Sequence, residues 1–149
     1  LYYYFYMHSG EYDKLLEQFD RYLRLESDNE QIIAFKGDVL INIGRKEEGL
    51  KWYKEQFEKN PQNYLVALSL ADFYITEGDS AKARQYLFNA IDNEEMYLND
   101  KINIINKHDQ LLQTDSAKYN DMLSTLYADN PQEEQIYKMR VAKALKNND

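Results

Sequence analysis

The sequence predicts an all-α protein built from repeated pairs of helices, and two observations carry this prediction. Gly10, Gly44 and Gly78 are evenly spaced along the chain, and each one follows an apolar segment and precedes a second amphipathic segment. Within each period the apolar residues are spaced as on one face of a helix, and they do not alternate as in a strand. A fixed period of about 34 residues is typical of stacked helical repeats, in which neighbouring units bury each other's apolar faces.

The boundaries of the helices follow from glycine and proline. A glycine after a helix can take the left-handed backbone conformation, so each of the three glycines is expected to follow the first helix of a pair. Pro61 and Pro131 follow second helices, where proline can open the next helix. In chain order, the predicted helices cover about residues 1–8, 12–25, 30–43, 46–59, 64–76, 80–93, 100–113, 116–128 and 133–146.

The spacing departs from the period of the glycines once. The interval from Pro61 to Pro131 exceeds two periods by two positions. Gly78 and Thr114 begin the matching segments GDSAKARQYL and TDSAKYNDML, and the interval between them exceeds one period by the same two positions. One two-residue insertion between residues 79 and 113 explains both spacings. It lies either in the turn at about residues 94–99 or in a lengthened helix before Thr114.

Small residues recur where the two helices of a pair would touch. In first helices they include Gly37 and Ala71, and in second helices Gly49 and Ala83. In these positions and in its period, the chain resembles the tetratricopeptide repeat family, whose unit is a helix-turn-helix of about 34 residues. The outer units depart from the family pattern, since Leu15 stands where the family has a small residue.

The resemblance covers nearly the whole chain and implies a single α-solenoid domain over residues 1–149. In such a domain, stacked helix-turn-helix units form a right-handed superhelix. The implied units cover about residues 1–29, which is truncated, 30–63, 64–97 and 98–131, followed by a capping helix at about 133–147.

The last predicted helix is interpreted as a cap on the array. Tyr137, Val141 and Ala144 have the spacing of a first-helix core, and lysine and arginine residues flank them. A helical array needs a terminal helix with a polar outer face, because its last apolar surface would otherwise meet water. The alternative is that this helix is the first half of a fifth unit.

Composition argues against several classes of partner. Asp and Glu outnumber Lys and Arg by 26 to 18, and the net charge of −8 repels the phosphates of nucleic acids. No apolar segment approaches the length that crosses a membrane, so no membrane insertion is expected. The chain begins with LYYYFYM and shows no targeting segment, so we expect a piece of a longer protein whose compartment, cytoplasm or periplasm, stays open.

The residue types needed for catalysis are scarce, so we expect no enzyme activity, no cofactor and no metal site. The chain has no cysteine, and His8 and His108 are its two histidines. Thiolate chemistry and a site with several histidine ligands are therefore excluded. The five glycines belong to turns and helix contacts, and they do not form a phosphate-binding loop.

The resemblance implies a concave groove lined by the first helices of successive units. The residues that map onto this groove are Tyr4, Met7, His8, Gln31, Ala34, Asp38, Ile41, Asn42, Leu65, Leu68, Asp72, Ile75 and Thr76. Some family members hold the acidic tails of chaperones in this groove with Lys, Arg and Asn side chains. Here Asp38 and Asp72 stand where that arrangement has Asn, so a neutral-to-basic peptide or an apolar helix fits better.

The sequence therefore predicts an acidic scaffold or adaptor that binds a protein or peptide partner in its groove. One alternative is a structural segment that self-associates through its aromatic residues 1–7. Another is a regulatory domain that belongs to a larger enzyme or sensor.

Overall fold

The computed structural model describes residues 10–146, and this part of the chain is helical, with no strand. It confirms the all-α class. The structure has two compact units, unit 1 (Leu1–Lys107) and unit 2 (His108–Asp149). The predicted helix at residues 1–8 lies outside the described residues.

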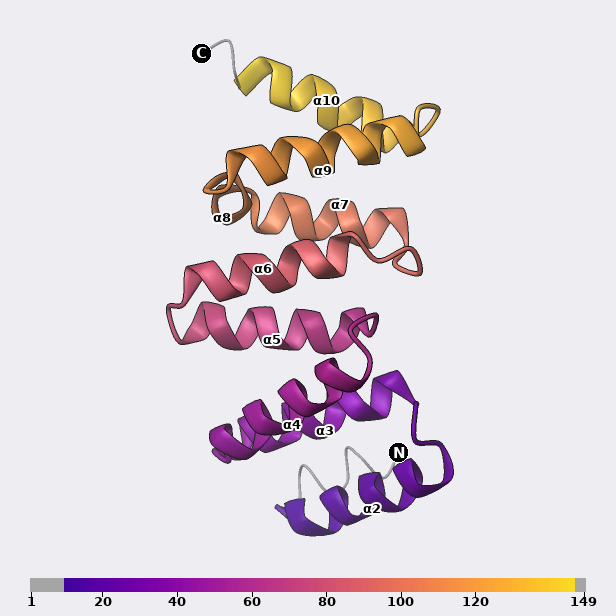
Figure 1. Cartoon of the computed structure of the whole chain (residues 1–149), viewed down its shortest axis with the longest axis vertical. Coiled ribbons are helices and arrows are strands. Elements are labelled where there is room, and N and C mark those ends of the chain that lie inside the picture. The colour runs from indigo at the N-terminus through magenta and orange to yellow at the C-terminus, as the bar shows by residue number, and fades with distance from the viewer. Residues whose placement is uncertain (1–9, 147–149) are drawn as a thin grey trace. The chain divides into compact units, whose positions relative to one another are not determined.

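Unit 1 is a series of helices joined by short turns (Figure 1). Its described helices are α2 (Tyr12–Leu25), α3 (Glu30–Asn42), α4 (Lys46–Lys59), α5 (Tyr64–Thr76), α6 (Ser80–Ile91) and α7 (Leu98–Lys107). Helices α3 and α4 pack as one hairpin and α5 and α6 as the next, while α5 also contacts α3 and α4. The first helices of the two hairpins therefore lie against each other.

The turns of unit 1 carry the expected local signals. Gly10, Gly44 and Gly78 have φ angles of 74°, 86° and 78°, which is the left-handed region that favours glycine. Asn29 and Asn63 precede α3 and α5, and each side chain accepts a hydrogen bond from a backbone N–H of the first turn, at 3.0 and 3.1 Å. These asparagine caps repeat with the same period as the glycines and fix where α3 and α5 begin.

Small residues bring the paired helices of unit 1 together, as expected. A Cβ atom on Gly37 would lie 2.1 Å from the ring of Tyr53, and one on Gly49 would lie 2.7 Å from Ile41. In the next hairpin Ala71 and Ala83 are fully buried. The backbones of each pair approach so closely that larger side chains would not fit.

Unit 2 contains α8 (Asp109–Gln113), α9 (Ser116–Asp129) and α10 (Glu134–Lys146). The carboxylate of Asp109 accepts a hydrogen bond from the Tyr119 hydroxyl, and the Lys143 ammonium lies 3.3 Å from the same oxygen. Lys143 Nζ is also 3.9 Å from the centroid of the Tyr119 ring. This partly buried group links α8, α9 and α10.

The two-residue insertion lies in the segment before Thr114 and not in the turn. Helices α3, α5 and α7 begin at residues 30, 64 and 98, so the period of the glycines still holds at the start of α7. The second helices α6 and α9 begin at residues 80 and 116. The extra residues therefore fall between Leu98 and Asp115, where the helical segment is interrupted at His108, with φ −114° and ψ 21°. The largest shifts of predicted boundaries are at the end of α6, which is Ile91, and at the start of α7, which is Leu98.

The core predicted for the last helix is wrong. Ile136 and Met139 are buried, whereas Tyr137 and Val141 are 69% and 41% exposed and Ala144 is also exposed. At the matching positions of α3 and α5, such residues face the second helix of their own pair. In α10 the residues at these positions are exposed instead.

A candidate binding groove between α3 and α5

A groove of about 520 Å³ in unit 1 is the best-formed candidate site among the described residues. It lies between α3 and α5, with the start of α4 at one end. Most of its surface is apolar, and a few polar groups point into it. Its lining residues are Gln31, Ala34, Phe35, Asp38, Ile41, Asn42, Lys46, Tyr53, Leu65, Leu68, Ser69, Asp72, Phe73, Thr76 and Glu77.

The structure brings together most of the residues that the sequence assigned to a groove. All of those assigned on α3 line it, namely Gln31, Ala34, Asp38, Ile41 and Asn42. On α5, Leu65, Leu68, Asp72 and Thr76 line it, whereas Ile75 is 39% exposed and lies outside the lining. Tyr4, Met7 and His8 fall outside the described residues.

Sequence reasoning missed the two phenylalanines of the groove. Phe35 is 47% exposed and precedes Asp38 by three positions, so helical spacing already places it on the groove face. Phe73 was harder to find, since its repeat partner, Val39, is completely buried. Together they give the groove an aromatic lining that the repeat comparison did not indicate.

Asp38 is bound into a small polar network on the groove floor. Its Oδ1 atom accepts hydrogen bonds from the hydroxyl of Tyr53 and, at 3.3 Å, from the hydroxyl of Ser69. Burial of Tyr53, together with its hydrogen bond to Asp38, raises the pKa of the Tyr53 phenol. The phenol therefore stays protonated and donates to the carboxylate. Asp38, Tyr53 and Ser69 come from α3, α4 and α5, so the network ties the three helices together.

Asp72 is placed differently from Asp38, although the two are equivalent in the repeat. Its side chain is exposed, and its carboxylate has no hydrogen bond or ion pair with any residue in the described range 10–146. At the same end of α5, Lys46 and Glu77 form an exposed ion pair of 3.0 Å. The charge of Lys46 is therefore matched by Glu77 and not by Asp72.

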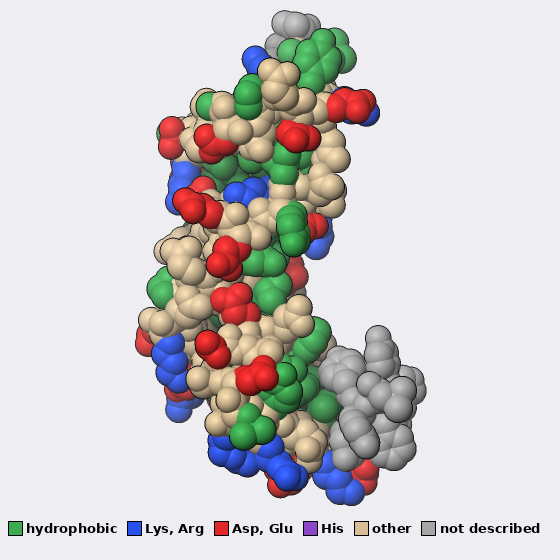
Figure 2. All heavy atoms as spheres, turned by 90° about the vertical axis from the view of Figure 1, so that its right-hand side faces the viewer, with side chains coloured by type: hydrophobic (Ala, Val, Ile, Leu, Met, Phe, Trp, Pro, Cys, Tyr) green, Lys and Arg blue, Asp and Glu red, His purple; other side chains and the backbone are tan. Residues whose placement is uncertain are grey.

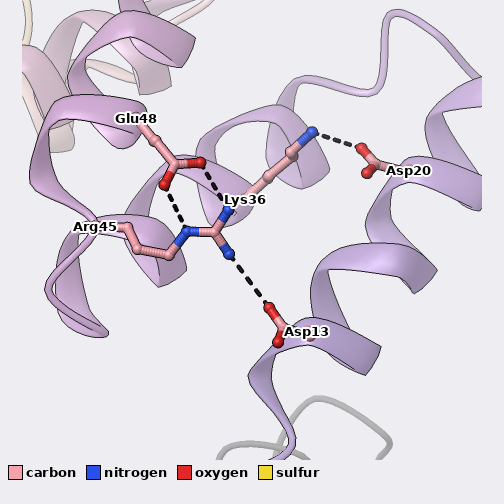
Figure 3. A network of polar contacts seen from close by, with 5 residues as sticks. All are labelled: Asp13, Asp20, Lys36, Arg45 and Glu48. Atoms are coloured by element: carbon pink, nitrogen blue, oxygen red, sulfur yellow. Dashed lines mark hydrogen bonds and ion pairs between the residues drawn. The ribbon is translucent and has the colours of Figure 1, made fainter.

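A second charged network joins α2 to the α3–α4 hairpin (Figure 3). Lys36 donates to Asp20, and Arg45 contacts Asp13 at 3.3 Å and Glu48 at 2.6 Å. The ammonium of Lys36 also lies 3.9 Å from the centroid of the Trp52 ring. The Arg45 pairs are exposed, and exposed ion pairs contribute about 0–1 kcal/mol each.

No group of three or more His, Asp or Glu side chains within residues 10–146 could hold a metal ion. None of the helices described there is both long and apolar enough to cross a membrane. Figure 2 shows red acidic side chains scattered among green hydrophobic ones on one face of the molecule, in keeping with the net charge of −8.

Comparison with models of protein families finds no match for this sequence, and comparison with curated proteins finds none either.

Proposed function

We propose that this chain is a tetratricopeptide-like α-solenoid that serves as a scaffold or adaptor, and that it binds a peptide or a partner helix in the α3–α5 groove. The role is binding and not catalysis. The observation that carries the proposal is the groove itself, which combines an apolar lining with a few directed polar groups.

The shape and chemistry of the groove favour an extended or helical peptide. Phe35, Leu68 and Phe73 offer an apolar surface for side chains, and Asn42 and Thr76 offer hydrogen-bonding groups at its border. An amphipathic helix or strand uses such surfaces, with apolar anchors that bury area and polar contacts that fix the register.

The charge of the groove favours a neutral or basic partner. Its lining includes three carboxylates, from Asp38, Asp72 and Glu77, and one ammonium, from Lys46. An acidic peptide or a nucleic acid backbone would be repelled here. The proposed partner is therefore a neutral-to-basic protein segment.

Selection from a displayed library of short random peptides tests the proposal. Binding peptides should be enriched on this protein relative to an unrelated helical protein. The variant Phe35→Ser, which introduces the residue present at position 69 in the next repeat, should weaken the selected peptides about tenfold, since it removes an aromatic anchor.

Charge reversal supplies a second variant with a matched control. Asp72→Lys should weaken the same peptides severalfold, while Glu47→Lys, an equal charge change on exposed α4 surface outside the groove, should not. Asp38 is a poor position for this test, because its reversal would also break the network with Tyr53 and Ser69. Failure to enrich peptides, or peptides insensitive to both groove variants, would overturn the proposed function.

A further inference from the structure

A second hollow of about 350 Å³ continues the groove beyond the first turns of α3 and α5. The two hollows share Gln31 and Leu65, so a bound chain can pass from one into the other. The lining of this second hollow comes from three turns and helix starts, and comprises Asn29, Glu30, Gln31, Tyr64, Leu65, Glu95 and Tyr97.

The turn between α6 and α7 presents Glu95 and Tyr97 to this hollow. Asn93 is 5% exposed; its side-chain amide donates to the carbonyl of Gln62 at 2.6 Å, and its oxygen accepts from the N–H of Glu95 at 2.8 Å. On the other side of Glu95, Met96 is buried in a cluster with Ala67 and Ala90. The backbone of Glu95 is therefore held between two buried neighbours while its side chain stays exposed.

The hollow holds negative charge that no described residue balances. Glu30 accepts a hydrogen bond from the Asn60 amide at 3.0 Å, and Glu95 makes no hydrogen bond or ion pair through its carboxylate within residues 10–146. Partial burial, and then repulsion by Glu95, raise the pKa of Glu30, with the Asn60 hydrogen bond acting in the opposite direction. A cation between the two carboxylates would reduce their repulsion.

Two aromatic rings line the same hollow. Tyr97 is 78% exposed, and Tyr64 is partly buried at the start of α5. Aromatic faces attract cations, and guanidinium groups stack on them while they pair with carboxylates. An exposed tyrosine beside unbalanced carboxylates is thus suited to a basic side chain, and it is poorly suited to an acidic one.

We propose that the hollow formed by Glu30, Glu95, Tyr64 and Tyr97 receives an arginine or lysine side chain of the peptide bound in the α3–α5 groove. This inference rests on the proposed function, and it adds which end of the groove holds the basic residue of the peptide. Apolar anchors of the peptide lie between Phe35, Leu68 and Phe73, and its basic residue lies beyond the starts of α3 and α5. The Lys46–Glu77 pair at the other end of the groove is already neutral.

Glu95 is the best position for a test. Glu30 lies in the first turn of α3, where a carboxylate also compensates the partial positive charge of the helix N-terminus. Glu95 has no such structural task, and its neighbour Glu94 is exposed in the same turn without lining the hollow. Glu94→Lys is therefore a matched control for Glu95→Lys.

The experiment uses the peptides selected on the full chain. They should carry arginine or lysine at a fixed distance from their apolar anchors. Glu95→Lys should weaken the best peptide at least tenfold, and Glu94→Lys should change its affinity less than about twofold, because charge effects on exposed surfaces fall off with distance. Replacing a peptide arginine with citrulline, or a peptide lysine with acetyl-lysine, removes the charge and should abolish the sensitivity to Glu95→Lys.

The possible failures can be told apart. Peptides that lose affinity with Phe35→Ser but show no basic residue, or no response to Glu95→Lys, would overturn this inference and leave the proposed function standing. Peptides whose affinity changes with neither Phe35→Ser nor Asp72→Lys would overturn both this inference and the proposed function.

Discussion

The two hairpins of unit 1, α3–α4 and α5–α6, solve the same packing problem with different residues. In α3–α4 a glycine, Gly37, faces a tyrosine, Tyr53, whereas the equivalent residues of α5–α6 are Ala71 and Leu87. All four are buried. The first pair combines the smallest residue with a large ring, and the second combines a methyl side chain with a branched aliphatic one, so both fill the contact between their helices.

The difference between the hairpins has a consequence for the groove. The ring of Tyr53 passes over Gly37 and carries its hydroxyl to Asp38, which a leucine could not do. The polar floor of the groove therefore depends on the glycine beneath the ring. Asp72, beside the Ala71–Leu87 pair, has no equivalent hydroxyl and remains exposed.

The largest expected effect comes from Gly37→Ala. Alanine has a higher helix propensity than glycine. However, its Cβ would lie 2.1 Å from the buried ring of Tyr53, which has little room to move. Overpacking of this kind costs about 1–3 kcal/mol of unfolding free energy. Urea denaturation followed by circular dichroism measures the change.

The matching double variant sharpens this prediction. Gly37→Ala with Tyr53→Leu recreates the Ala–Leu pair of the second hairpin, so it should be more stable than the sum of the two single changes predicts. Simple additivity would show that Tyr53 and Gly37 are not coupled, and the comparison between the hairpins would fail.

Tyr53→Phe should have the next largest effect. It keeps the ring over Gly37 but removes the hydroxyl that donates to Asp38, and the loss of such a hydrogen bond costs about 1 kcal/mol or somewhat more. Tyr86→Phe is the control, because the Tyr86 hydroxyl makes no hydrogen bond to any residue that the structure describes. In thermal unfolding, the melting temperature of Tyr53→Phe should be lower than that of Tyr86→Phe and that of the wild type.

A smaller effect is expected at the equivalent position of the last helix. Val141 matches Gly37 and Ala71 in the repeat, but it is 41% exposed, so Val141→Ser should change stability by less than about 0.5 kcal/mol. Ala71→Ser, which buries a hydroxyl, is the contrasting variant. A large loss with Val141→Ser would mean that another surface covers this face in solution.

The smallest effect concerns the turns that follow the two hairpins. Asn60 in the first turn hydrogen-bonds to Glu30, while Glu95 in the second repels it and helps to raise its pKa. A raised pKa means that ionisation of Glu30 opposes folding, and that this cost is absent below the unfolded pKa. Glu95→Gln should therefore raise the melting temperature slightly at neutral pH, and the gain should shrink below about pH 4, near the ordinary pKa of glutamate. A gain that persists unchanged at low pH would contradict the repulsion.

Much of the fold could be predicted because its signals are local. Gly44 and Gly78 and the prolines mark turns through backbone geometry alone, and the predicted bounds of α2, α4 and α5 agree with the structure. The end of α6 was misplaced because Asn93 bonds to Gln62, a residue far away in sequence. Such tertiary contacts leave no periodic pattern.

The groove residues that occupy equivalent positions of the repeat could be predicted from the sequence. Asp38 and Asp72 align in the sequence, yet one is bound by hydroxyl groups and the other is free of them. That difference arises from Tyr53 and Ser69, which lie on other helices. Glu95 was missed for a similar reason, because a turn outside the first helices brings it to the end of the groove.

The chain has one tryptophan, Trp52, and its position makes it a local optical probe. The indole N–H donates to the carbonyl of Ile33 at 2.8 Å, and the Lys36 ammonium lies over the ring. Its emission therefore reports on the α3–α4 hairpin and on the cluster that this hairpin forms with α2. Fluorescence and circular dichroism recorded on one sample would then show whether this hairpin melts together with the remaining helices or before them.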